Sequence, residues 1–159
     1  MTQSQYKCQV QGKESFIDSL FVVFSQSYLI NAVQQYCKLY GHDSKNRPNV
    51  LELGCYTGRV MHFMTQQMLF VNYTGVDVRQ KYLAYSPVKR RKDVTLLCED
   101  VTKGLSVPNG SQDMIISSEV LEHIDAVELP GVIKTLYDKL SFGGRLVVSF
   151  PMNTRDKQF

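Results

Sequence analysis

The chain has 159 residues, of which 43% are hydrophobic and 21% are charged, and its formal net charge is +3. This length fits one domain with a sizeable core, and the charge is too small to indicate nucleic-acid binding by itself. The cysteines Cys8, Cys37, Cys55 and Cys98 form no CxxC pair and have no regular spacing, which suits a reducing cytosol better than a disulfide framework. No apolar run is typical of a signal peptide or a membrane span, so we expect a cytoplasmic protein.

Apolar periodicity predicts an amino-terminal helix at residues 27–40, which is followed by a polar loop at residues 42–48. Beyond this loop, apolar runs rich in β-branched residues alternate with helical patterns. The expected strands are Val50–Leu53, Tyr73–Val78, Val94–Cys98, Met114–Ser117 and Leu146–Phe150. The expected helices are Arg59–Leu69, Arg79–Tyr85 and Glu128–Leu140, and the last should be ended by Phe142-Gly143-Gly144.

Strands that alternate with helices indicate β-α-β units and a parallel sheet, and continuous apolar strands fit a sheet that is covered on both faces. We therefore expect a doubly wound, Rossmann-like α/β domain with the strand order 3-2-1-4-5. In such sheets the ligand binds outside the carboxyl ends of the strands, where the strand order reverses. The functional residues should lie just after each strand.

The first expected strand runs into the turn Gly54-Cys55-Tyr56-Thr57-Gly58. Glycine permits positive φ and a close approach of the backbone, and a helix N-terminus offers free N–H groups. Such a turn can hold a small polar or anionic ligand against the main chain. It is not a GxGxxG turn, because Tyr56 replaces the second glycine, and it is not a P-loop, because no Lys-Ser/Thr pair follows Gly58. A tight turn without a ligand is the alternative.

Acidic residues follow the second and third expected strands. Asp77 lies about 20 residues after Gly58, the spacing at which an acid binds the ribose hydroxyls in nucleotide-binding folds. Asp100 can accept a hydrogen bond from an exocyclic amine, and the N–H of Val101 can serve a ring nitrogen. Each acid can instead cap the helix that follows it. Taken together with the glycine turn, the two acids describe an adenosine site.

Four motifs, in order and at normal spacing, resemble the class I S-adenosylmethionine-dependent methyltransferases, and most closely the small-molecule-type methyltransferase domains. They are Glu52-Leu53-Gly54-Cys55-Tyr56-Thr57-Gly58, Gly75-Val76-Asp77, Glu99-Asp100-Val101 and the run from Asp113 to Ile124. The resemblance covers about residues 49–151. It implies S-adenosylmethionine as cofactor and methyl transfer to an oxygen or nitrogen nucleophile of an acceptor, which we expect to be a small molecule.

The resemblance also implies roles for matched positions. Glu52 and Gly54 would hold the methionine part of the cofactor, Asp77 would bind the ribose, and Val78 would pack on the adenine. Asp100 and Val101 would read the adenine edge. The expected cofactor-binding set is completed by Cys55, Tyr56, Gly58 and Ser117.

Tyr56 departs from the family, which usually has glycine at this position so that the backbone can approach the cofactor. If the position needs positive φ, tyrosine costs of order 1 kcal/mol or more. Two alternatives follow. Either the turn tolerates the residue with its ring facing outward, or the ring alters cofactor affinity or lines the substrate side.

Glu119, Glu122 and His123 are spaced so that they would share one face of a helix. We expect His123 and Glu119 to be catalytic candidates, because histidine is a common general base. The trio could instead bind a divalent metal, or Glu122 and His123 could be structural. The metal alternative resembles the small-RNA 3′-end 2′-O-methyltransferases, but no histidine follows His123 to complete that ligand set. We therefore expect no metal.

We expect a helical cap at residues 1–48 and an S-adenosylmethionine-binding domain at residues 49–159. Family members normally continue past the fifth strand with a helix and two further strands, so we expect a fragment or a minimal version that lacks these strands. In a minimal version the fifth strand is an exposed edge, which a homodimer or a partner chain could cover. Two alternative functions stay open, a metal-assisted RNA methyltransferase and a non-catalytic module that binds the cofactor and acts through a partner.

Overall fold

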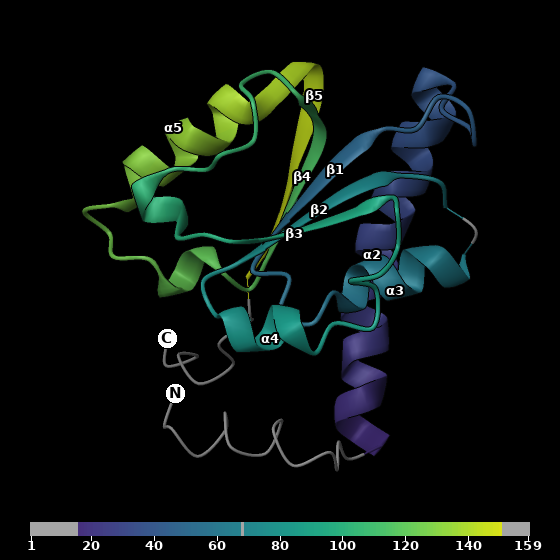
Figure 1. Ribbon diagram of the computed structural model, residues 1–159, viewed down its shortest axis with the longest axis horizontal. Coiled ribbons are helices and arrows are strands. Elements are labelled where there is room, and N and C mark those ends of the chain that lie inside the picture. Colours follow the sequence, from purple (N-terminus) through teal and green to yellow (C-terminus); the bar gives the residue numbers. More distant parts are fainter. Residues whose placement is uncertain (1–15, 68, 151–159) are drawn as a thin grey trace, which may run out of the picture.

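The computed structural model describes residues 16–67 and 69–150, which contain one five-stranded sheet with helices on both faces (Figure 1). The strands are β1 (Asn49–Leu53), β2 (Asn72–Asp77), β3 (Val94–Cys98), β4 (Gln112–Ser118) and β5 (Leu140–Ser149). Their order across the sheet is β3-β2-β1-β4-β5, and every neighbouring pair is parallel. The predicted fold class and strand order are therefore confirmed.

Helices cover the two faces of the sheet. They are α2 (Phe16–Tyr40), α3 (Arg59–Gln66), α4 (Gln80–Ala84) and α5 (Leu129–Lys139), with short 3-10 turns η1 (Val101–Lys103) and η2 (Leu121–His123). In Figure 1, α2 and α3 lie on one face and α5 lies on the other. No helix in the described part of the chain has both the length and the apolar character needed to cross a bilayer.

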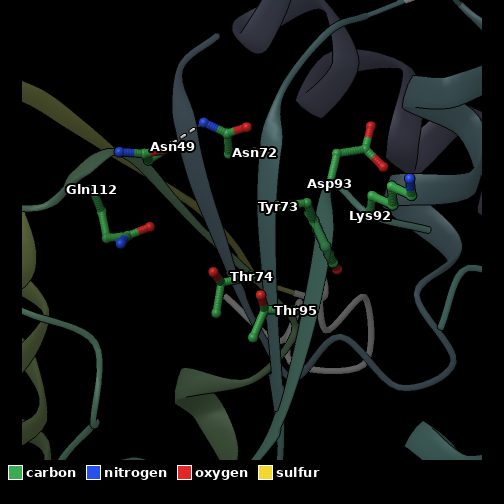
Figure 2. Close-up of a pocket in the computed structure, with 8 residues that line it drawn as sticks. All are labelled: Asn49, Asn72, Tyr73, Thr74, Lys92, Asp93, Thr95 and Gln112. Atoms are coloured by element: carbon green, nitrogen blue, oxygen red, sulfur yellow. Dashed lines mark hydrogen bonds between the residues drawn. The ribbon is translucent and has the colours of Figure 1, made fainter. Parts of the chain in front are cut away.

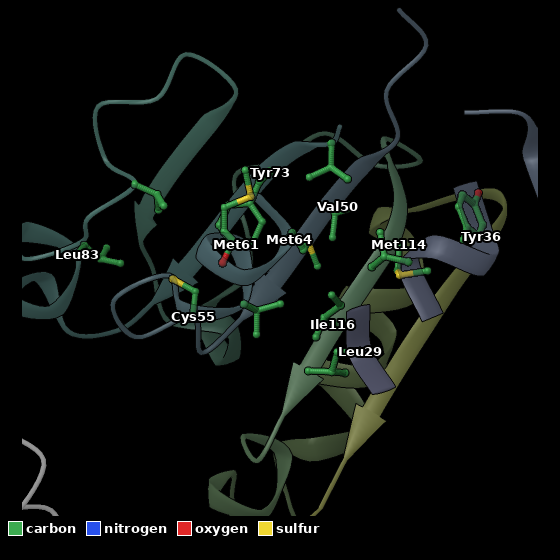
Figure 3. Packing of buried hydrophobic residues seen from close by; sticks show 14 residues of the cluster. Leu29, Tyr36, Val50, Cys55, Met61, Met64, Tyr73, Leu83, Met114 and Ile116 are labelled. Carbon is green, nitrogen blue, oxygen red and sulfur yellow. The ribbon is translucent and has the colours of Figure 1, made fainter. Parts of the chain in front are cut away.

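Two apolar cores lie on opposite faces of the sheet. Val50 of β1 belongs to the core beneath α2 and α3, whereas its neighbour Leu51 belongs to the core beneath α5. This alternation follows from the two-residue period of a strand, and it explains why the strands read as continuous apolar runs. Figure 3 shows the first core, where side chains of α2 and α3 meet those of β1, β2 and β4.

The amino-terminal helix is longer than the pattern indicated, because α2 begins at Phe16 rather than at residue 27. Leu29, Val33 and Tyr36 of α2 are buried in the first core, so this helix packs directly on the sheet. The division of the chain at residue 48 stays a prediction. Cys8, the rest of residues 1–15 and residues 151–159 lie outside the described residues.

The largest difference from the expected elements concerns β5. This strand begins at Leu140 rather than at Leu146, so Phe142-Gly143-Gly144 lies inside the strand and does not end α5, whose last residue is Lys139. The β4–β5 register shifts between Gln112 and Met114, and Gly143 has a φ of +79°. An irregularity of this kind accommodates glycine within a strand. The sequence pattern had instead indicated that Gly143 and Gly144 end the preceding helix.

Candidate functional site

A cavity of about 260 Å³ lies at the carboxyl ends of β1, β2, β3 and β4. Strand order reverses at this edge between β1 and β4, which is where doubly wound sheets bind their ligands. The residues that line it are Leu53, Gly54, Val76, Asp77, Val78, Glu99, Asp100, Val101, Thr102, Val120, His123, Ile124, Asp125 and Glu128. Of the residues expected to bind the cofactor or to be catalytic, Gly54, Asp77, Val78, Asp100, Val101 and His123 meet here.

The glycine turn after β1 forms the floor of this cavity at Gly54. Gly54 and Gly58 have φ values of +69° and +78°, a region that side chains rarely adopt. A Cβ added to Gly54 would collide with the Cγ2 methyl of Val120. A side chain at position 54 would therefore require Val120, which lines the cavity, to move.

Asp77 ends β2 and is held by two loops. Its side chain is 8% exposed. Its Oδ2 accepts a hydrogen bond of 3.0 Å from the backbone N–H of Tyr56, and its Oδ1 accepts one of 2.8 Å from the backbone N–H of Arg79. A carboxylate has about four acceptor positions, so each oxygen can accept a further bond from a ligand. Anchoring the local backbone and binding a ribose are therefore compatible roles for Asp77.

Asp100 and Val101 form the wall of the cavity after β3. The Oδ1 atom of Asp100 accepts hydrogen bonds from the hydroxyl of Thr102 at 2.8 Å and from its backbone N–H at 3.1 Å. These bonds, led by the one from the hydroxyl, lower the pKa of Asp100, so the side chain is ionised at neutral pH. Val101 is buried, whereas Val78 on the β2 side is exposed at the cavity. The two valines provide apolar surface beside the acids.

The described lining of the cavity is rich in acidic residues. It includes the carboxylates of Asp77, Glu99, Asp100, Asp125 and Glu128 and, among the residues that the structure describes, no lysine or arginine, although Nζ of Lys103 lies 3.3 Å from Oδ2 of Asp100. Since the whole chain has a net charge of +3, this negative lining is local. It favours a ligand that carries positive charge and disfavours polyphosphates.

Sequence reasoning did not assign Asp125 and Glu128, which follow η2 and join the cavity through the loop between β4 and α5. Their position in space depends on how that loop folds back over the edge of the sheet, which no local pattern encodes. The only available signal was their closeness in sequence to the run from Glu119 to His123.

Glu52 lies beneath the glycine turn and does not line the cavity. It is 5% exposed, and its Oε2 accepts a hydrogen bond from the hydroxyl of Tyr73. Burial raises the pKa of Glu52 to about 8, despite the hydrogen bond from Tyr73. Burial also raises the pKa values of the Tyr73 hydroxyl and the Cys55 thiol. Cys55 and Gly58 likewise lie outside the lining of the cavity.

Tyr56 has a φ of +54°, so its position in the turn does require the left-handed conformation. Its ring packs against the ring of Tyr82 in α4, with 4.2 Å between centroids and an interplanar angle of 49°. The guanidinium of Arg59 lies 5.6 Å from the centroid of the Tyr56 ring. The ring thus contacts α4 and does not line the cavity.

Ser117 is fully buried near the carboxyl end of β4 and does not line the cavity. Its hydroxyl has no hydrogen-bond partner among the described residues, and it is the one buried side-chain N or O atom of that part of the chain in this state. Buried polar atoms normally have a partner.

The expected helical face of Glu119, Glu122 and His123 does not exist. Glu119 has a φ of +54°, which a right-handed helix cannot contain, and η2 covers only Leu121–His123. Of the three, only His123 lines the cavity. The part of the chain that the structure describes contains no group of three His, Cys, Asp or Glu residues placed to hold a metal ion.

A second concave region, of about 250 Å³, lies at the opposite edge of the sheet, near the amino ends of β1 and β2 (Figure 2). The Nδ2 atom of Asn72 donates to Oδ1 of Asn49 at 3.0 Å, and Asp93 pairs with Arg91 at 2.7 Å. None of the expected site residues lines this region. The cavity at the carboxyl ends is therefore the candidate functional site.

Comparison with known proteins identifies the family of this chain. Residues 25–158 match a family model described as a methyltransferase domain. The malonyl-[acyl-carrier protein] O-methyltransferase of Bacillus cereus is 32% identical over 101 residues, which cover 63% of this chain and 36% of that protein. The chain therefore spans about a third of the length of this relative.

Solved structures show the same fold. A structure described as an S-adenosylmethionine-dependent methyltransferase from Mesorhizobium loti has a TM-score of 0.57 and 26% identity, over 65% of this chain and 46% of that one. The PH0226 protein of Pyrococcus horikoshii has a TM-score of 0.64 and 21% identity, over 84% and 55% of the two chains. This chain belongs to the methyltransferase domain family, and its fold is that of the class I S-adenosylmethionine-dependent methyltransferases.

Proposed function

We propose that the chain binds S-adenosylmethionine, the cofactor of its class, in the cavity at the carboxyl ends of β1–β4. We further propose that it transfers the methyl group to an oxygen or nitrogen nucleophile of a small-molecule acceptor. The observation that carries the proposal is the placement of Asp77, a buried and anchored carboxylate with free acceptor positions at the cavity wall. Methyl transfer by the whole protein is part of the proposal, because the chain spans only a third of its Bacillus relative.

The acidic groups of the cavity fit this cofactor. S-adenosylmethionine has a sulfonium and an ammonium group, and the lining residues that the structure describes include five carboxylates and neither lysine nor arginine. In the proposed arrangement, Asp77 accepts the ribose hydroxyls, Asp100 and Val101 contact the adenine edge, and Val78 packs on its face. The turn at Gly54 leaves room for the methionine part, since no Cβ occupies it. We propose that Glu52 and Tyr73 support this turn from below.

When bound, the cofactor supplies an electrophilic methyl group on its sulfonium. The contribution of the protein is to hold donor and acceptor in line, which converts a bimolecular reaction into an effectively unimolecular one. His123 lies in the wall of the cavity with its side chain 51% exposed, so an acceptor that enters from solvent can reach it. We propose that the imidazole removes the proton of an acceptor that arrives protonated. Glu119 lies outside the lining, so we assign it no proton transfer.

The test follows a labelled methyl group from S-adenosylmethionine into a cell extract that has been separated into small molecules, proteins and RNA. We expect label in the small-molecule fraction, and none with the Asp77→Ala variant. Label confined to RNA would instead support the RNA alternative. An unlabelled extract, together with intact cofactor binding, would contradict methyl transfer and support a binding module.

Three further points stay predictions of the sequence. They are the cytoplasmic location, the helical cap at residues 1–48, and a homodimer or partner chain at the edge of the sheet. β5 lies at one edge of the described sheet, which is compatible with the last of these but does not favour it over an isolated chain.

A further inference from the structure

The two N–H groups that hold Asp77 come from different loops. Tyr56 belongs to the turn between β1 and α3, and Arg79 belongs to the turn between β2 and α4. Each loop has its own backbone hydrogen bond, from the N–H of Gly58 to the carbonyl of Cys55 at 2.7 Å and from the N–H of Tyr82 to the carbonyl of Arg79 at 3.0 Å, but both loops are short. Tyr56 is in a left-handed conformation, and α4 has five residues and no side-chain cap at Arg79. A helix this short depends on tertiary contacts for its order.

Besides Asp77, the side chain of Tyr82 also joins these two loops. Tyr82 of α4 is 9% exposed, and its ring packs on the ring of Tyr56 at 4.2 Å between centroids. Nη1 of Arg79 donates a hydrogen bond of 2.9 Å to the hydroxyl of Tyr82, and the Arg79 guanidinium lies 5.6 Å from the centroid of the same ring. The residues whose N–H groups bind Asp77 are therefore also the residues whose side chains meet on Tyr82.

We infer that Tyr82 is a positioning residue for the cofactor site, and that it acts by keeping the N–H groups of Tyr56 and Arg79 aimed at the Asp77 carboxylate. Tyr82 is not among the residues that line the cavity, so the inference assigns it no direct contact with the ligand. The inference rests on the proposed role of Asp77 in binding S-adenosylmethionine. The inference also assigns a role to Tyr56, because its ring, at a position where the family usually has glycine, is the surface on which the Tyr82 ring packs.

The test is a double-mutant cycle in which calorimetry measures the affinity for S-adenosylhomocysteine. The variants are Tyr82→Ala, Asp77→Asn and the double variant, with Tyr85→Ala as the matched control because Tyr85 is 82% exposed beside α4. An aromatic contact of this kind corresponds to up to about a tenfold change in affinity. We expect Tyr82→Ala to weaken binding by about this factor, and Tyr85→Ala to leave it unchanged.

In the Asp77→Asn background, we expect Tyr82→Ala to change the affinity by less than about twofold, since residues that act through one another are not additive. Equal effects of Tyr82→Ala in both backgrounds would overturn the inference, as would wild-type affinity of Tyr82→Ala. Tyr82→Phe keeps the ring and should bind nearly as wild type. A loss with Phe as large as with Ala would overturn the role of the ring contact.

Two controls keep the outcomes separate. Unchanged binding by Asp77→Asn would refute the proposed cofactor site, whatever Tyr82 does. If thermal melting shows that Tyr82→Ala does not fold, Tyr82→Leu replaces it in the cycle, because leucine fills apolar volume without offering a ring face. A folded Tyr82→Leu variant with wild-type affinity would overturn the inference.

Discussion

Replacing the buried Glu52 by glutamine should make the chain more stable at neutral pH. The carboxyl is 5% exposed, it accepts a hydrogen bond from Tyr73, and burial raises its pKa from 4.5 to about 8. A glutamine side chain keeps the shape and an oxygen that can accept the bond from Tyr73. The substitution removes the ionisation of this side chain, so folding no longer requires it to take up a proton at neutral pH.

The sign and size of the expected pH dependence follow from the pKa values of Glu52 in the unfolded and folded chain. The folded chain holds the Glu52 proton more tightly than the unfolded chain does. The stability from Glu52 is therefore complete below about pH 4.5 and is lost as the pH rises through about 8. Each pH unit in this window corresponds to about 1.4 kcal/mol. Between about pH 5.5 and 7.5, Glu52 thus lowers the free energy of unfolding by roughly 3 kcal/mol, and we expect Glu52→Gln to abolish this slope.

The assay is urea unfolding of both proteins, followed by circular dichroism at several pH values across this window. Glu122→Gln in η2, where the side chain is 22% exposed and lies 4.0 Å from His123, is the matched control and should keep most of the wild-type slope. The argument would be refuted if wild type and Glu52→Gln lost stability in parallel as the pH rises. Such a result would mean that Glu52 is ionised in the folded chain at neutral pH.

Other predictions concern the turn and the histidine. Tyr56→Gly relieves the strain of the left-handed conformation but removes the ring contact, so the free energy of unfolding should change by less than about 1 kcal/mol. Tyr56→Ala removes the ring contact without relieving the strain, so in urea melts it should be about 1 kcal/mol less stable than the glycine variant. Equal stabilities would argue against strain at Tyr56. Gly54→Ala should abolish S-adenosylhomocysteine binding in calorimetry, because the added Cβ clashes with Val120. Adding Val120→Ala should restore part of the binding, and no restoration would contradict the clash as the cause of the loss. His123→Ala should reduce methyl transfer by roughly a hundredfold or more while cofactor affinity stays within about threefold, and an unchanged rate would exclude His123 as the base.

The three central strands β2, β1 and β4 could be predicted because they are mostly buried, which leaves apolar runs such as Val50–Leu53. Strand order and the place of the site followed from the β-α-β rule and the family motifs, and Asp77, Asp100 and Val101 lie together as expected. These features depend on short-range patterns. The early start of β5 was missed because its register shift places Gly143 within the strand, where glycine normally suggests an end.

The missed parts of the site depend on contacts between distant segments. The spacing of Glu119, Glu122 and His123 fits a helix, but the backbone N–H of Glu119 donates to the carbonyl of Ser149 in β5, and its φ is positive. The pairing of Tyr56 with Tyr82 likewise joins residues 26 positions apart through the fold. Neither contact leaves a periodic signal in the chain.

The most direct test of the central claim is a calorimetric titration of the wild-type chain and the Asp77→Ala variant with S-adenosylhomocysteine. We expect saturable binding to the wild type and no detectable binding to the variant, while both proteins show cooperative thermal unfolding. A wild type that does not bind, or a folded variant that binds with wild-type affinity, would contradict this claim.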